Sequence, residues 1–312
     1  MKSIMKLILA IVLFSIFILF LKNQYSPILL RNATYGMPAL IEKGEIKNLY
    51  IGSSMFRQGL DIITLGEDKN CNYILAYNGN QPVLEYRQLK YLIDRGVQIE
   101  NLYVDMYVYS AFERPEISDE KIFLEIDLKE KWKLWNLISK QEKTSFADFW
   151  RMFITSNNEL LMTWPINNVV LNSQFIQGGV LTKPEGASYE ILSKSEIYGI
   201  AEGMELSQKE AIESMIQLCK DHNIDLCFVE TPKFEKVVYD DAYQNAMKEY
   251  VGLLQKYAVS MFLSRTTADS LTDKSGVIEY NFKHYNAENF VDTIHLSYMG
   301  RLEFTKKLSE MQ

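Results

Sequence analysis

Leu49-Tyr50-Ile51-Gly52-Ser53-Ser54 is the stretch that decides the fold, because a short apolar run ends there in a Gly-Ser-Ser turn. A turn of this kind between a strand and a helix can present a serine side chain. Near the other end of the chain, Asp292 lies three residues before His295. An acid at this spacing can hold the imidazole in the tautomer that leaves its other ring nitrogen free to deprotonate a serine. With only 3 histidines in 312 residues, His295 is a strong candidate for a general base.

Apolar runs of strand length alternate with helical patterns along the chain. The expected strands are 48–51, 73–77, 102–107, 226–230 and 259–263. The expected helices are 82–95, 207–222, 243–257 and 299–311. This alternation indicates a parallel sheet with helices on both faces, and such sheets place their sites at the carboxyl ends of the strands. We therefore predict an α/β, doubly wound, mostly parallel five-stranded sheet whose carboxyl edge brings Ser54 close to Asp292 and His295.

One long stretch interrupts the alternation after the third expected strand, at about 113–200. It contains all four tryptophans, which are Trp132, Trp135, Trp150 and Trp164. Its first half looks helical, over 122–139 and 145–154, whereas 163–188 is rich in turn residues. We expect a large insertion here. Its aromatic residues either form a lid or a sugar-binding element, or they pack the insertion's own core or contact a membrane.

The N-terminal segment is apolar from 7 to 21, with one serine and with lysines on both sides. This run is shorter than the roughly 20 residues that span a bilayer comfortably, but no small-residue cleavage site follows it. An uncleaved anchor is therefore favoured over a cleaved signal peptide. The expected organisation is a membrane anchor at 1–22, a connector at 23–45, and a catalytic domain at 46–312. The lysines would hold the short N-terminal tail in the cytoplasm and place the domain on the extracytoplasmic side.

Charge and cysteine content exclude some classes of function. The formal net charge is −7, and no basic stripe is interleaved with aromatic residues, so we expect no nucleic-acid partner. The three cysteines are Cys71, Cys219 and Cys227. Their odd number and their spacing favour small buried side chains over disulfides or metal ligands. We expect neither a metal nor a cofactor.

The Gly52-Ser53-Ser54 turn resembles the first sequence block of the SGNH (GDSL-like) hydrolase superfamily, which usually reads Gly-Asp-Ser. Ser53 replaces the aspartate, as is typical of the DltD/AlgJ/AlgX-like cell-envelope acyltransferase branch. A serine that merely caps a helix would explain an isolated Gly-Ser-Ser equally well. Asp292-x-x-His295, however, resembles the superfamily's last block, and the pair together favours catalysis. The resemblance covers roughly 46–110 and 220–312.

The resemblance implies a role for each matching residue. Ser54 would be the nucleophile, His295 the general base, and Asp292 the residue that orients it. The stretch 77–82 resembles the second block, so that the N–H groups of Ser54 and Gly79, with Asn80 as a side-chain donor, would form the oxyanion hole. The asparagine of the usual third block is absent after the third strand, where Asn80 or Tyr107 could take its place. A plain Asn-Gly turn before a helix that starts with proline explains the second block structurally.

The resemblance also implies a function. We expect an extracytoplasmic serine O-acyltransferase or esterase in the cell membrane that modifies a cell-envelope polysaccharide or teichoic-acid-like polymer with acetyl or D-alanyl groups. Its expected partners are that glycopolymer and a multi-pass MBOAT-type membrane acyltransferase. Two alternatives stay open. One is a non-catalytic protein of the same fold that binds glycan or acts as a scaffold for the acyltransferase, and the other is an esterase of free lipids.

Overall fold

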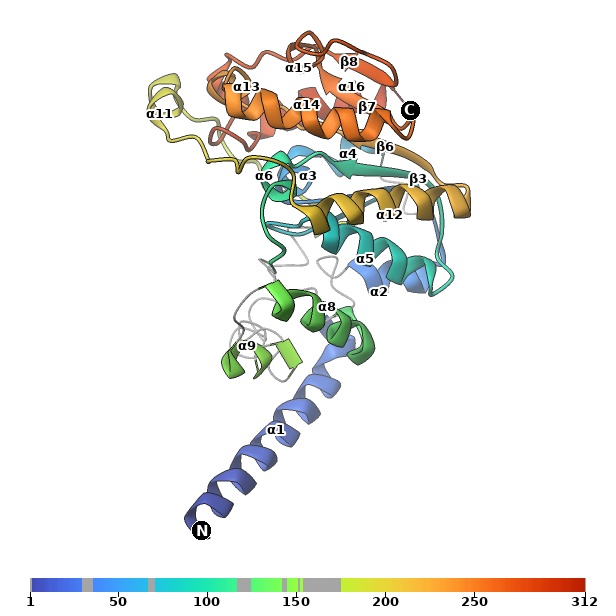
Figure 1. Ribbon diagram of the computed structural model, residues 1–312, viewed down its shortest axis with the longest axis vertical. Coiled ribbons are helices and arrows are strands. Elements are labelled where there is room, and N and C mark those ends of the chain that lie inside the picture. The colour runs from blue at the N-terminus through green and yellow to red at the C-terminus, as the bar shows by residue number, and fades with distance from the viewer. Residues whose placement is uncertain are drawn as a thin grey trace.

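A parallel six-stranded sheet lies at the centre of the protein (Figure 1). The computed structural model describes residues 2–29, 36–66, 71–116, 125–141, 145–150, 152–153 and 175–311. The strand order is β2-β1-β3-β6-β7-β8, and every neighbouring pair is parallel. The strands are β1 (Glu45–Gly52), β2 (Asn72–Ala76), β3 (Gln98–Asp105), β6 (Asp225–Val229), β7 (Ser260–Ser264) and β8 (Val277–Tyr280). The prediction of a doubly wound α/β fold is confirmed.

The predicted number of strands, five, is wrong, because β8 adds a sixth at one edge of the sheet. This strand has four residues. Ile278 and Glu279 are exposed, while Tyr280 is buried. A short edge strand that is largely exposed lacks the continuous apolar run of a central strand. It is also too short to show a clear alternation of apolar and polar residues. The pattern that identified the other strands was therefore missing here.

Helices cover both faces of the sheet, and side-chain direction along the strands assigns the two cores. On β1, Leu49 and Ile51 belong to one cluster of buried side chains, and Tyr50 belongs to the other. This is the period-two alternation of a strand that is buried on both sides. The first face is covered by α2 (Gly36–Lys43), α5 (Pro82–Ile93), α12 (Leu206–His222) and α14 (Asp241–Gln255). The second is covered by α3 (Ser54–Gly59), α4 (Ile62–Leu65) and α16 (Tyr298–Ser309).

The strand order places a topological switch point beside β1. The chain passes from β1 to β2 on one side and then crosses to β3 on the other, so the carboxyl end of β1 lies where the order reverses. Open α/β sheets form their sites at such points. The remaining short elements lie mainly in the connections: α6 (Val108–Ala111), α13 (Glu235–Val238), α15 (Arg265–Ala268) and the 3-10 helix η2 (Ala287–Asn289).

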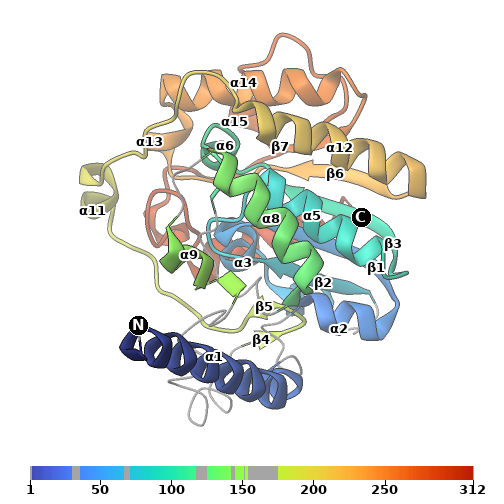
Figure 2. The same ribbon diagram turned by 60° about the horizontal axis from the view of Figure 1, so that its bottom comes forward.

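The predicted insertion contains α8 (Leu128–Gln141), α9 (Phe146–Trp150), a hairpin of β4 (Phe175–Ile176) and β5 (Gly179–Val180), and α11 (Tyr189–Lys194). Helices α8 and α9 lie toward the end of the molecule that carries α1 (Lys2–Leu29) (Figures 1 and 2). Trp135 packs edge-on against Phe149 and Phe153, so this part of the insertion has an aromatic core of its own. Trp164 lies outside the described residues.

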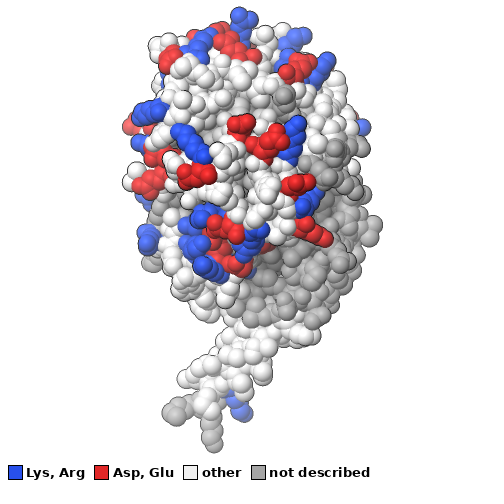
Figure 3. Space-filling model, turned by 90° about the vertical axis from the view of Figure 1, so that its right-hand side faces the viewer, with Lys and Arg blue, Asp and Glu red and all other residues white. Residues whose placement is uncertain are grey.

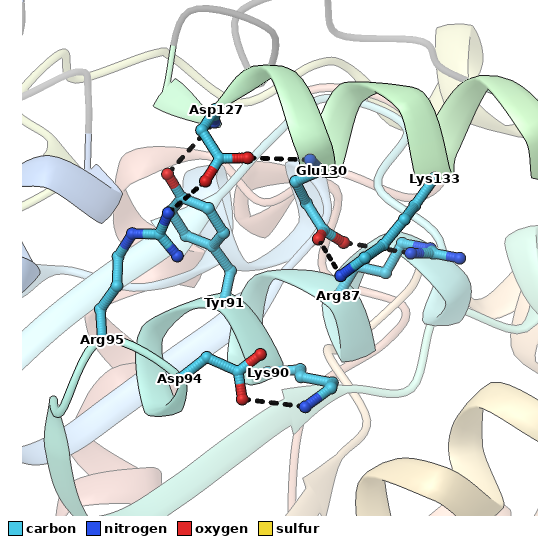
Figure 4. Close-up of polar contacts among 8 residues, drawn as sticks. All are labelled: Arg87, Lys90, Tyr91, Asp94, Arg95, Asp127, Glu130 and Lys133. Carbon is cyan, nitrogen blue, oxygen red and sulfur yellow. Dashed lines mark hydrogen bonds and ion pairs between the residues drawn. The ribbon is translucent and has the colours of Figure 1, made fainter.

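Polar contacts hold α8 against α5 (Figure 4). Arg87 pairs with Glu130 at 3.1 Å, and Arg95 pairs with Asp127 at 2.5 Å. Tyr91 accepts a hydrogen bond from the Asp127 N–H at 3.2 Å. The Asp127 side chain is about half exposed, whereas that of Glu130 is largely buried. This part of the insertion is therefore attached by ion pairs that water reaches in part.

The β4–β5 hairpin lies along β2, the edge strand at the other side of the sheet. The Ile74 N–H donates to the Gln177 carbonyl at 2.9 Å. Gly178 has a φ of +77°, and a Cβ at this position would lie 1.8 Å from the Ile74 carbonyl oxygen. Only glycine allows the hairpin to approach this closely. The turn of the hairpin thus occupies part of the hydrogen-bonding edge of β2.

Two helices form the described part of the N-terminal region. Helix α1 runs from Lys2 to Leu29, past the expected end of the anchor at 22. Helix α2 lies inside the expected connector, and its Met37 and Leu40 are buried in the domain core. Among the described residues, no helix combines the length and apolarity needed to cross a membrane. On the face in Figure 3, acidic and basic side chains are interspersed over the domain.

Candidate active site

Ser54 is the first residue of α3 and directly follows the turn at the end of β1. Ser53 is the N-cap residue, and its hydroxyl accepts a hydrogen bond from the Met55 N–H at 3.1 Å. Ser53 is fully buried, whereas Ser54 is half-buried. The turn therefore directs one serine into the protein and the next toward the carboxyl edge of the sheet.

The loop before α16 carries the other two predicted residues. The Val291 N–H donates to the His295 carbonyl at 2.9 Å, which closes a tight loop around Asp292. One carboxylate oxygen of Asp292 accepts from the N–H groups of Ile294 and His295, at 2.9 and 2.8 Å. The other lies 2.8 Å from His295 Nδ1. Burial raises the pKa of Asp292, but the hydrogen bonds from His295 and the backbone outweigh it and hold the pKa below its usual range.

The three side chains form one hydrogen-bonded series. Ser54 Oγ lies 2.9 Å from His295 Nε2. Because the Asp292 carboxylate can only accept, it assigns the proton of the neutral imidazole to Nδ1, and Nε2 is then free to accept the proton of Ser54. The structure thus brings together Ser54, Asp292 and His295, from opposite ends of the chain. Their geometry is that of a nucleophile, a general base and a residue that orients the base.

Two of the three predicted oxyanion donors are main-chain groups near this turn. Ser54 occupies the first helical position of α3, where an N–H group has no acceptor within its own helix. Gly79 lies in the turn after β2 with a φ of +62°. The Tyr77 N–H donates to the Gly52 carbonyl at 3.1 Å, so the turn after β2 is joined to the Gly52-Ser53-Ser54 turn.

Asn80 does not have the arrangement predicted for a side-chain donor. Its side chain is buried, and its amide nitrogen donates to the Gly52 carbonyl at 3.3 Å and to Gln88 Oε1 at 3.0 Å. Both hydrogens of the amide are therefore used inside the protein. Asn80 joins the turns after β1 and β2, and its proposed contact with an oxyanion is not available in this arrangement.

Asp105, at the carboxyl end of β3, was not among the predicted site residues. It is 2% exposed, and its carboxylate accepts from the hydroxyl of Ser53 at 2.5 Å. A Cβ on Gly52 would lie 2.6 Å from the Asp105 Cβ, so only glycine fits between the two strand ends. The signal in the sequence was an acid at the end of an apolar strand, since such a buried charge requires partners.

Arg301, on α16, was also missed. It is 1% exposed. Its Nε donates to the Gln58 carbonyl at 2.6 Å, and its Nη1 donates to the carbonyls of Val180 and Thr182 at 2.8 and 3.1 Å. One guanidinium therefore connects the helix that carries Ser54, the helix that follows His295, and the end of the insertion.

We call the stretch 180–188 the return segment, because it leads from β5 back toward the domain along the loop that carries Asp292 and His295. The Ala187 N–H donates to the Phe290 carbonyl at 2.7 Å, and the Tyr298 N–H donates to the Pro184 carbonyl at 2.9 Å. A Cβ on Gly186 would lie 2.3 Å from the Glu288 carbonyl oxygen. The return segment thus contacts the loop that carries Asp292 and His295 on both sides of these residues.

Within the ranges that the structure covers, no group of three or more histidine, cysteine, aspartate or glutamate side chains is arranged to hold a metal ion. Burial raises the pKa of Cys219 and of Cys227 to about 12. Such thiols stay protonated at neutral pH and are poor nucleophiles.

Comparisons with known proteins leave the family open. No protein-family model matches this chain, and no curated protein matches it. Ten chains of solved structures do match. One of them, provisionally described as a platelet activating factor from Streptococcus pneumonia, is 14% identical with a TM-score of 0.40, over 95% of this chain and 98% of that chain. A likeness of this strength carries no argument about function. The resemblance to the SGNH superfamily therefore depends on the motifs.

Proposed function

We propose that this protein is a serine esterase or O-acyltransferase of the SGNH type. The observation that carries the proposal is the series Ser54–His295–Asp292, with a hydroxyl 2.9 Å from an imidazole nitrogen whose ring is oriented by a carboxylate at 2.8 Å. A hydroxyl is a weak nucleophile at neutral pH unless a base accepts its proton, and this arrangement supplies the base.

In the first half of the proposed reaction, Ser54 Oγ attacks the carbonyl carbon of an ester, and His295 Nε2 accepts the hydroxyl proton. The carbonyl π electrons move to the oxygen, and the resulting oxyanion is held by the N–H groups of Ser54 and Gly79. Collapse of this intermediate breaks the bond to the leaving alkoxide. His295 gives that oxygen the proton, and the acyl group stays on Ser54 as an ester.

In the second half, His295 removes a proton from water or from an acceptor hydroxyl, and that oxygen attacks the acyl-serine. The bond to Ser54 Oγ then breaks, and His295 returns the proton to it. Water gives hydrolysis, and a polymer hydroxyl gives transfer. We propose the latter, with a cell-envelope polysaccharide or teichoic-acid-like polymer as acceptor, acetyl or D-alanyl as the acyl group, and an MBOAT-type membrane acyltransferase as partner. This part of the proposal is supported by the resemblance of the motifs.

The test of the chemistry is covalent labelling of the purified protein by a fluorophosphonate, followed by peptide mass spectrometry. Label is expected on Ser54, and Ser54→Ala should abolish it. His295→Ala should slow it by at least about 10⁴-fold, since the base is lost. Ser275→Ala is the matched control, because Ser275 lies in the exposed turn before β8. Labelling that persists in Ser54→Ala at the wild-type rate would overturn the proposal.

The non-catalytic alternative requires a test in cells. A scaffold would support envelope acylation without its serine, whereas an enzyme would not. We expect Ser54→Ala cells to lose the same envelope acyl groups as cells that lack the whole gene, measured by release of acetate or D-alanine on mild alkaline treatment. Full acylation in Ser54→Ala cells, together with loss in the deletion strain, would favour the scaffold.

A further inference from the structure

We propose that Asp105 is a positioning residue. Through its contact with Ser53, it sets the direction of the Gly52-Ser53-Ser54 turn. Its Oδ2 accepts two hydrogen bonds from Ser53, one from the hydroxyl at 2.5 Å and one from the N–H at 3.3 Å. This inference rests on the proposed function, because it assigns a role to a group behind the proposed nucleophile.

The Ser53 hydroxyl acts as a link between β3 and α3. It donates to Asp105 and at the same time accepts from the Met55 N–H in the first turn of the helix. A hydroxyl has one proton, so its donation to Asp105 orients the lone pairs that face Met55. Ser53 is therefore committed to two fixed partners inside the protein, and Ser54 is the serine that stays available for chemistry.

The contact leaves little freedom of movement. Ser53 has no exposed surface, Asp105 is 2% exposed, and Gly52 separates the ends of β1 and β3 with no room for a side chain. Helix α3 has six residues, too few to be stable without tertiary contacts. Its first turn must therefore be fixed by tertiary contacts, and Asp105 holds the N-cap residue Ser53, which in turn accepts from the Met55 N–H.

The buried carboxylate has its own supporting groups. Burial raises the pKa of Asp105, while the Ser53 hydroxyl, the charge of Lys233 and a hydrogen bond from Thr231 oppose that rise. Thr231 Oγ1 donates to Asp105 Oδ1 at 3.4 Å, and Lys233 Nζ donates to the Thr231 carbonyl at 2.8 Å. Lys233 is fully buried. A buried acid and a buried base in one polar cluster are costly in stability, and a local ordering role would account for keeping them.

Positioning of this kind acts on the rate because Ser54 is the next residue along the chain. Its Oγ must lie within hydrogen-bond distance of His295 Nε2 and face the carbonyl carbon of the substrate. A displacement of about 1 Å at a reacting atom can lower a rate by about 100-fold. Substrate binding depends on other groups, so the loss should appear in kcat and not in KM.

The experiment exchanges the two ends of the hydrogen bond. Asp105→Ser leaves two hydroxyls face to face, and Ser53→Asp places two carboxylates together in a buried site. The double variant restores one carboxylate and one hydroxyl, and aspartate is as good an N-cap residue as serine. We expect each single variant to lose about 100-fold in kcat for p-nitrophenyl acetate with KM within about threefold. The double variant should recover at least about tenfold over the poorer single variant, since coupled residues are not additive.

Two further variants make the outcome decisive. Asp105→Asn keeps the shape and one acceptor oxygen for Ser53, so it should keep kcat within about tenfold of wild type. Ser54→Ala tests the proposed function separately: if it keeps activity, the proposed function fails. If Ser54→Ala is inactive but the losses of the two single variants simply multiply in a folded double variant, the role of Asp105 is overturned and the proposed function stands.

A crystal structure of Asp105→Ser gives a readout that does not depend on turnover. The expected result is a Ser54 Oγ to His295 Nε2 separation beyond hydrogen-bond distance, with β3 unchanged. An unchanged separation near 2.9 Å would overturn the proposal even if the variant had lost activity.

Discussion

The two ends of the Ser54–His295 pair are supported in different ways. Ser54 is fixed from inside the sheet, where Ser53 contacts the buried carboxylate of Asp105. His295 is fixed from outside, where the return segment meets its loop through main-chain hydrogen bonds and through Arg301. The first support consists of buried ionisable groups, and the second consists of carbonyls and a guanidinium that stays charged at all accessible pH values. The supporting groups behind Ser54 should therefore respond to pH, whereas the main-chain and guanidinium contacts of the return segment should not.

The comparison also divides the insertion into two parts. Its α8 part is attached to α5 by ion pairs that are partly exposed (Figure 4). Its return segment is half-buried or exposed, and main-chain hydrogen bonds attach it to the loop that carries Asp292 and His295. The insertion is therefore not a single accessory element: among the described residues, its return segment contacts the loop that carries Asp292 and His295, whereas its α8 part contacts α5.

The largest effect is expected from Arg301→Ala. The variant removes a buried side chain that donates to three partly buried carbonyls, which should lower the free energy of unfolding by about 3 kcal/mol. Fluorophosphonate labelling of Ser54 should slow as well, since α3 and the return segment lose their common contact. Urea unfolding and labelling rates check both effects. Arg265→Ala, at an exposed arginine, is the control, and equal stability of the two variants would contradict the role of Arg301.

The next effect is expected from Gly186→Ala, which sharpens the contrast between the two parts of the insertion. The new methyl group would meet the Glu288 backbone, so either the return segment or the loop that carries Asp292 and His295 must move. The free energy of unfolding should fall by about 1–3 kcal/mol. Gly199→Ala is a matched control, because nothing lies within 4 Å of a Cβ there. Thermal unfolding and labelling should separate the two alanine variants. If they behave alike, the return segment does not hold the loop.

A pH-dependent effect is expected from Glu85→Gln, on the nucleophile side. Burial, and then the negative charge of Asp105, raise the pKa of Glu85 well above its ordinary value of 4.5. The native state then binds more protons than the unfolded state, so the stability that this group contributes is present below pH 4.5 and is lost as pH rises through the native pKa. Glutamine keeps the shape and removes that loss. Unfolding midpoints measured from pH 4 to pH 8 should fall less steeply in the variant, and identical slopes would contradict this assignment.

The smallest effect is expected from Glu130→Ala, which removes the α8 ion pair with Arg87. The pair with Lys133 is lost as well, but stability should fall by only about 1 kcal/mol, because the two cations are partly exposed and water can hydrate them. The rate of Ser54 labelling should not change, since this ion pair joins α8 to α5 and not to the segments that carry Ser54, Asp292 and His295. Lys90→Ala, from the exposed Lys90–Asp94 pair, serves as a baseline. A labelling defect in Glu130→Ala would show that the first part of the insertion also supports the site.

Local signals explain what could be predicted from the sequence. The Gly-Ser-Ser turn and Asp292-x-x-His295 are each contained in a few consecutive residues. Apolar runs identified five of the six strands, including the edge strand β2, which is almost entirely buried. β8 escaped because an edge strand with exposed Ile278 and Glu279 has no such run. Asn80 was assigned to the wrong contact because its partners, Gly52 and Gln88, are set by tertiary packing.

The supporting residues of the site had weaker signals. Asp105 meets Ser53 only because β1 and β3 pair in a register that places Ile51 beside Val104. A single chain does not display that register. Arg301 donates to main-chain carbonyls, which every residue has, so no pattern of side chains could reveal its partners. The chemistry of the site is thus local in the sequence, whereas its supports are not.

The contact between the β4–β5 hairpin and β2 has a consequence for solubility. An uncovered edge strand offers its N–H and C=O groups to a second copy of the protein and so promotes aggregation. In the native chain, Gln177 occupies the Ile74 N–H, and the glycine that follows it lies against the Ile74 carbonyl. The opposite edge of the sheet, at β8, presents the exposed charge of Glu279. The hairpin thus shields one margin of the sheet from self-association, and a protein shortened through the insertion would be expected to precipitate even with its triad intact.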